Sequence, residues 1–146
     1  GPRFSGSFSR ATAAFDVPVG LATSTSVLGF VATARGATSL AIEWQRRSFR
    51  HAHLAGQPRA LAVALVGLAA ATAASGDGRW AARLLGAADQ LRRKSGALAA
   101  QREQEDADAV RRRAQALLGA NYAHEYERGG QLAPEDVVNQ GAADPE

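Results

Sequence analysis

Apolar residues recur along this chain at the three- and four-residue steps of amphipathic helices, and glycines separate the first stretches. Segments that alternate apolar and polar residues for the length of a strand are missing. The sequence therefore predicts an all-α protein of about six or seven helices. The expected helices cover residues 18–34, 38–55, 58–74, 78–95, 101–118, about 120–127, and 134–140.

Segment 58–74 is apolar almost all round, so we expect it to form the central and most buried helix. Its neighbours in sequence are amphipathic. In the preceding helix, Ala41, Trp44 and Ser48 mark a narrow inner face. In the following helix, Trp80 begins the inner stripe, and Arg83 is expected to face outward. Helix start signals are Thr38 or Ser39 for the second helix and Asp77 for the fourth.

An internal repeat links the first two helix pairs. Residues 27–41 (VLGFVATARGATSLA) align with residues 65–82 (LVGLAAATAASGDGRWAA), and Gly29 matches Gly67 at an offset of 38. Repeats of this length, built from two antiparallel helices, are typical of an α-solenoid. We therefore expect a short solenoid of antiparallel helix pairs, similar to tetratricopeptide (TPR) repeats.

Composition excludes several kinds of functional site. The chain has no cysteine, so disulfides, thiol catalysis and thiolate metal sites are excluded. Most of the apolar residues are alanines, which favour closely packed helices. No uninterrupted apolar run reaches the roughly 18 residues that a membrane span needs. The opening also lacks the layout of a secretory signal. We expect a cytoplasmic protein without a membrane partner.

Three regions are expected along the chain. Residues 1–16 are rich in serine and glycine and predict a flexible lead-in, in which Gly1-Pro2 matches the pair left after protease removal of a tag. Residues 17–138 form the predicted helical-repeat domain. Residues 139–146 are expected to be a frayed tail.

Charge is unevenly distributed. Residues 1–100 hold 12 basic and 4 acidic residues, a net charge of +8, and residues 101–146 hold 5 and 10, a net charge of −5. Basic clusters raise nucleic-acid binding as one hypothesis, but aromatic residues for base stacking are not interleaved with them. We expect a polarised molecule rather than a nucleic-acid binder, with the acidic part pairing with the basic part or with another copy.

Several residues are candidates for a binding surface. The two tryptophans lie 36 residues apart, near the repeat offset, which favours wedges between helix pairs over a ligand platform. If Glu43 pointed into a groove beside both tryptophans, it would be partly desolvated and a candidate for function, although a solvated glutamate is the simpler interpretation. The full candidate set for a ligand or partner is Glu43, Trp44, Arg47, His51, Trp80, Arg83 and Tyr122.

The histidines offer the main alternative chemistry. His51 and His53 are two residues apart, so on a helix they diverge by about 200° and are poorly placed to share a metal ion. His124 has Tyr122, Glu125 and Tyr126 nearby, a set that could do acid–base work in a cleft, although packing is the simpler interpretation. No metal or cofactor is expected. The residues of an enzyme alternative are Glu43, His51 and His124.

The run PRALAVALVGLAAATAASGDGRWAARLLGAADQLRRKSGA resembles the C-terminal TPR-like repeats of large ATP-dependent LuxR-type bacterial transcriptional regulators. AARLLGAA is the specific part, and the resemblance covers about residues 19–138. It implies a helical-repeat region of such a regulator. The P-loop pattern G-x-x-x-x-G-K-[ST] and the helix-turn-helix of the family do not occur, so ATP hydrolysis and DNA reading are not implied.

The sequence thus favours a non-catalytic module for protein–protein interaction or effector sensing. Its expected partner is a protein, a sister subunit in a homo-oligomer, or a small-molecule effector. A small enzyme that performs acid–base chemistry on a biosynthetic intermediate is the alternative, and nucleic-acid binding is the third hypothesis.

Overall fold

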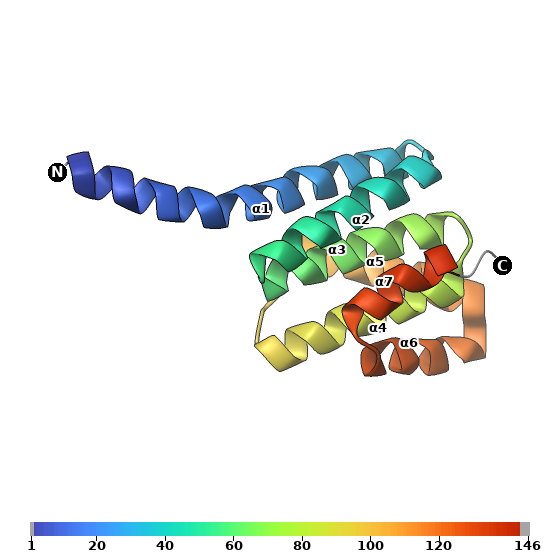
Figure 1. Ribbon diagram of the computed structural model, residues 1–146. Helices are drawn as coiled ribbons and strands as arrows, with labels where there is room; N and C mark the ends of the chain where they lie inside the picture. The colour runs from blue at the N-terminus through green and yellow to red at the C-terminus, as the bar shows by residue number, and fades with distance from the viewer. Residues whose placement is uncertain (1, 144–146) are drawn as a thin grey trace.

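The computed structural model describes the backbone of residues 2–143 and the side chains of residues 17–140. Helices account for every regular element in this range, so the all-α prediction is confirmed (Figure 1). In chain order they are α1 (Pro2–Ala34), α2 (Thr38–Ala55), α3 (Pro58–Ala74), α4 (Gly78–Ser95), α5 (Gln101–Leu118), the short 3-10 helix η1 (Gly119–Asn121), α6 (Tyr122–Gln131) and α7 (Pro134–Ala143).

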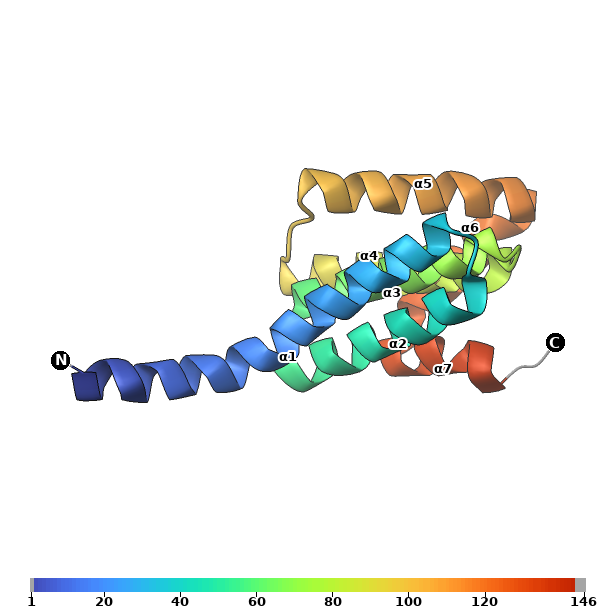
Figure 2. The ribbon, with the colours of Figure 1, turned by 90° about the horizontal axis from the view of Figure 1, so that it is seen from above.

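Each of α2 to α5 packs on the helix that precedes it in sequence, whereas α6 and α7 pack mainly on α4. α1 and α2 form one antiparallel pair and α3 and α4 a second, and α3 packs on both helices of the first pair (Figure 1). α5 packs on α3 and α4, α6 on α4, and α7 on α4 and α3. Figure 2 shows α5 on one side of the molecule and α2 and α7 on the opposite side. This packing order is compatible with stacked helix pairs.

Glycine ends the helices where the sequence predicts. Gly36 and Gly56 have φ of 77° and 63°, the left-handed conformation that only glycine adopts without strain. Asp77 caps α4, since its Oδ1 accepts a hydrogen bond from the Trp80 N–H at 3.1 Å. The expected caps of α2 are wrong, because Thr38 and Ser39 lie inside the helix and the N-cap residue is Ala37, whose carbonyl accepts a hydrogen bond from the Ala41 N–H.

α3 is the central helix, as expected. Its residues Leu65 and Leu68 are fully buried and contact side chains from four other helices. The partners in this core are Phe49 of α2, Trp80, Leu84 and Leu85 of α4, Val110 of α5, and Val137 and Val138 of α7.

The two repeat-matched glycines enclose one side chain. Gln45 of α2 is 0% exposed and lies against Gly29 of α1 and Gly67 of α3; a Cβ on either glycine would collide with its amide group. The Gln45 Nε2 donates to the Ser26 carbonyl at 3.0 Å. Ala41 and Ser48 of the inner face predicted for α2 are buried, as expected, but Gln45 is buried with them and Trp44 is only half-buried.

A second close approach joins α4 and α6. A Cβ on Gly86 would collide with the Tyr126 carbonyl, and a Cβ on Gly129 with the Arg83 backbone. The two helices thus touch backbone to backbone, and α6 is held there by the glycine of AARLLGAA. This contact explains why that segment carries a glycine in mid-helix despite its cost to helix propensity.

The ends differ from the expected boundaries. α1 continues back to Pro2 through the predicted lead-in and extends beyond the other helices (Figure 1). Pro18, expected in a first turn, lies inside this helix, where it lacks the N–H for one backbone hydrogen bond. α7 continues to Ala143, past the expected domain end at 138. The last three residues of the predicted tail lie outside the described range.

The half of α1 that packs on the body is long and apolar enough, by length and composition alone, to cross a membrane. This half is Val17–Ala34, and 28% of its residues are buried in the structure. This segment has no uninterrupted apolar run, but its serines and threonines lower the mean hydropathy only slightly, so it still reaches the level of a membrane span.

The α4–α6 contact yields a matched pair of variants. Gly129→Ala should lower the free energy of unfolding by about 2–3 kcal/mol, because the added methyl group must push two backbones apart. Gly130→Ala is the control, since its Cβ would make ordinary contact with the Gly86 carbonyl at 3.4 Å. It should be neutral or slightly stabilising. Urea unfolding measures both, and equal stabilities would contradict the backbone contact.

Candidate functional site

The exposed side of α2 brings four candidate residues together. Glu43, Trp44, Arg47 and His51 follow the three- and four-residue steps of one helix face. The Glu43 Oε1 lies 2.7 Å from the Arg47 Nη2, and the Arg47 guanidinium lies over the Trp44 ring, 5.1 Å from its centroid. We call these four residues the α2 flank.

Glu43 is a solvated carboxylate, the simpler of the two interpretations, and does not lie in a groove. Its side chain is 58% exposed and is paired with Arg47, which is 44% exposed, one helical turn away. Such exposed pairs contribute about 0.3–0.5 kcal/mol, so this one orients Arg47 more than it stabilises the fold. His51, the last residue of the flank, is half-buried.

Trp80 does not belong to this surface. It is 9% exposed, and its Nε1 donates a hydrogen bond to the Val137 carbonyl of α7 at 2.8 Å. Arg46 lies over its ring at 5.2 Å, whereas the adjacent Arg47 lies over Trp44. Because neighbouring residues of a helix point in different directions, the two tryptophans lie on different sides of α2. Trp80 is a core wedge, as the repeat offset favoured.

Arg83 is also an internal residue rather than an outward one. Its Nε donates to the Glu125 Oε1 of α6 at 2.7 Å, and its Nη1 donates to the Gln140 Oε1 of α7 at 3.2 Å. Arg79 lies 3.7 Å from the same glutamate. The two C-terminal helices therefore cover a side chain that amphipathic spacing alone places in solvent.

Tyr122 contributes to a polar cluster between α4, α5 and α6. The Tyr126 hydroxyl donates to the Asp89 Oδ2 at 2.6 Å, and Arg111 donates to the same oxygen at 3.2 Å and to the Tyr122 hydroxyl at 3.3 Å. Burial raises the pKa of Tyr122 above its usual value, and Arg111 only partly opposes this. The Tyr122 phenol is therefore protonated near neutral pH and acts as a hydrogen-bonding group. Asp89, which joins this cluster, belongs to no motif in the sequence.

The structure separates the His–Glu–Tyr set that was the catalytic alternative to packing. Glu125 turns to Arg83, Tyr126 turns to Asp89, and His124, which precedes them on α6, is exposed. His53 of α2 contacts the first turn of α7, with its Nδ1 3.4 Å from the Glu135 Oε1. Among the described side chains, no group of three or more His, Asp or Glu residues is arranged to hold a metal ion.

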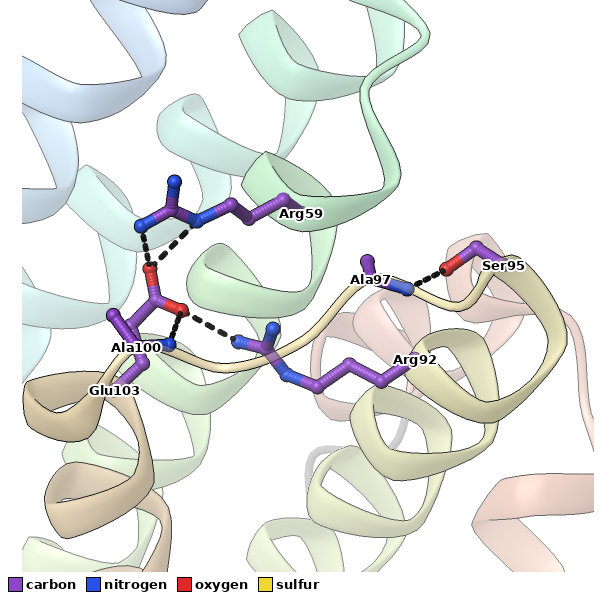
Figure 3. Close-up of polar contacts among 6 residues, drawn as sticks. All are labelled: Arg59, Arg92, Ser95, Ala97, Ala100 and Glu103. Atoms are coloured by element: carbon purple, nitrogen blue, oxygen red, sulfur yellow. Dashed lines mark hydrogen bonds and ion pairs between the residues drawn. The ribbon is translucent and has the colours of Figure 1, made fainter.

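Glu103 is the charged centre of the α4–α5 connection (Figure 3). Its carboxylate accepts hydrogen bonds from Arg59 of α3 at 2.9 and 3.1 Å, from Arg92 of α4 at 3.4 Å, and from the Ala100 N–H at 3.0 Å. This glutamate thus connects the first turn of α5 to two other helices.

The sequence has three basic clusters, at residues 46–50, 92–94 and 111–113, and each has an arginine that contacts a side chain of another helix. Arg46 lies over Trp80, Arg92 pairs with Glu103, and Arg111 pairs with Asp89. Burial lowers the pKa of Arg46, with a smaller contribution from nearby Arg50. Fewer cations are thus free for phosphate contacts than the sequence count implies.

Comparison with protein-family models, with curated proteins and with solved structures found no match to this chain. The assignment of a function therefore depends on the geometry above.

Acid should weaken the Glu103 connection. Burial raises the pKa of Glu103, but the Ala100 N–H and Arg59 outweigh burial, so its pKa lies below the ordinary value of 4.5. A lowered carboxylate pKa means that this stabilisation is present above the ordinary pKa and is lost as pH falls through the folded pKa. Glu103→Gln should cost about 1–2 kcal/mol near neutral pH.

In acid the wild-type carboxyl is protonated and therefore uncharged, like the amide of Glu103→Gln. The difference in free energy of unfolding between the variant and the wild type should then shrink. Urea unfolding near neutral pH and in acid measures this difference. Glu105→Gln, an exposed acid two residues further along α5, is the matched control and should change little. A deficit of the same size at both pH values would rule out the carboxylate charge as its cause.

Proposed function

We propose that this chain is a non-catalytic helical-repeat module that binds a partner protein through the α2 flank. The observation that carries the proposal is the exposed stack of Arg47 on Trp44, with Glu43 fixing the guanidinium. Tryptophan and arginine are the residue types that dominate binding energy at protein interfaces. Here they are already held in one conformation, which lowers the entropic cost of binding.

The form of this surface favours a protein over a small molecule. Small ligands bind in concave sites that bury most of their area, whereas the α2 flank is the outer face of a helix. Leu40 and Leu54, which are 48% and 76% exposed, add apolar area elsewhere on α2.

The separation of the acid–base candidates supports a binding role over the enzyme alternative. General acid–base catalysis needs groups within hydrogen-bond reach of one substrate. Glu43 and His51 lie eight residues apart, about 12 Å along the helix axis. His124 belongs to α6, which packs on α4 at the other end of the array.

The resemblance to LuxR-type regulators gives the proposal a context. In such a regulator, partner binding at the repeats would be relayed to the ATPase and DNA-binding domains, in the cytoplasm of a bacterium. The AARLLGAA segment would act in that relay by holding α6 and α7 on the repeats.

The test replaces Leu54, a 76% exposed residue of α2 three positions beyond the flank, with a photo-crosslinking amino acid to identify the partner. Binding of the purified partner is then measured by calorimetry. Trp44→Ala and Arg47→Ala should each weaken binding at least tenfold, since each removes a partner of the stack, with unchanged helicity by circular dichroism. Arg113→Ala, an exposed arginine on α5, is the control. Unchanged affinity in both α2 variants would refute the proposal.

A further inference from the structure

The outward face of α1 is apolar and has no partner among the described residues. Val17, Leu21, Val27, Leu28 and Val31 are between 42% and 57% exposed, and they lie outside the buried arc of this helix. Contiguous exposed apolar residues mark interaction sites. The outer face of a terminal helix in a repeat array is normally polar, so this face differs from a solvent-exposed end.

The spacing on this face is that of a helix-pairing seam. Val17, Leu21, Ser24, Leu28 and Val31 follow steps of four, three, four and three residues, the heptad pattern by which two helices interlock. We call these five residues the α1 seam. Thr23, the residue before Ser24, has its hydroxyl satisfied locally, since it donates to the Val19 carbonyl at 3.1 Å. A helix can therefore pack here without stranding that hydroxyl.

We propose that the α1 seam is a dimer interface, in which α1 packs antiparallel against α1 of a second copy of this chain. The charges of the sequence favour this occupant and direction. Residues 17–34 carry no charge and are flanked by Asp16 and Arg35. An antiparallel pair brings opposite charges near each other at both ends, whereas a parallel pair brings like charges together.

In this arrangement Leu21 of one copy faces Leu28 of the other, Val17 faces Val31, and the small Ser24 lies at the centre. Eighteen residues of helix provide about 27 Å of contact. The dimer interface does not include the α2 flank, so the dimer proposal is independent of the function proposed above.

A lipid bilayer fits the same face less well. α2 packs along this half of α1 and carries Glu43, Arg46, Arg47 and Arg50. Inserting α1 with its neighbour in place would carry these four charged side chains toward the hydrocarbon, where each is costly.

Sedimentation equilibrium on the full chain tests the dimer. The wild type should show a concentration-dependent dimer, and Leu28→Glu should raise its dissociation constant at least tenfold. Leu98→Glu makes the same change at a leucine that is 87% exposed in the α4–α5 linker, and it should dimerise like the wild type. Circular dichroism checks that each variant is folded.

Mixing two variants tests the direction of pairing. Leu21→Lys and Leu28→Glu should each be monomeric alone, but an equimolar mixture should associate. The ammonium group introduced by Leu21→Lys in one chain then faces the carboxylate introduced by Leu28→Glu in the other. A monomeric wild type, or a Leu28→Glu variant that still dimerises, would overturn the proposal. So would a mixture that stays monomeric, or a monomeric chain that binds phosphatidylcholine vesicles through this face.

Discussion

The distance between helices in this protein is set by residues with little or no side chain. Gly29 and Gly67 leave room for one glutamine, and Gly86 and Gly129 let α4 and α6 meet at their backbones. Interiors packed at this density have few ways to absorb an added methyl group. The arrangement of the other side chains depends on this spacing, because the ion pairs between helices require fixed separations.

Close packing also decides which polar groups are available for function. With α6 and α7 held on α4, Arg83 meets Glu125 and Gln140, and Trp80 meets the Val137 carbonyl. These side chains could have formed a reactive or ligand-binding site, but instead they form hydrogen bonds and ion pairs that connect the helices. The stack of Arg47 on Trp44 differs in that it lies on an accessible helix face, and our functional proposal follows from that difference.

Much of the fold could be predicted from the sequence because its signals are local. Glycine turns and the Asp77 cap lie next to the helices that they delimit, and the matched glycines made the repeat visible. The site was less predictable. Gln45 is a polar residue whose burial depends on two other helices, and Arg83 meets Glu125 across 42 residues. Neither contact leaves a pattern within its own helix.

The most direct test of this account is a double-mutant cycle on Gln45 and Gly67. Gly67→Ala alone should destabilise the protein by about 2 kcal/mol, because the methyl group collides with the enclosed glutamine. Gln45→Ala alone should also destabilise it, by leaving a cavity. The double variant should be more stable than the sum of the two losses predicts, by about 1–2 kcal/mol, since the new methyl group occupies the vacated space. Additive losses in urea unfolding would contradict the claim that these residues set the spacing of the helices.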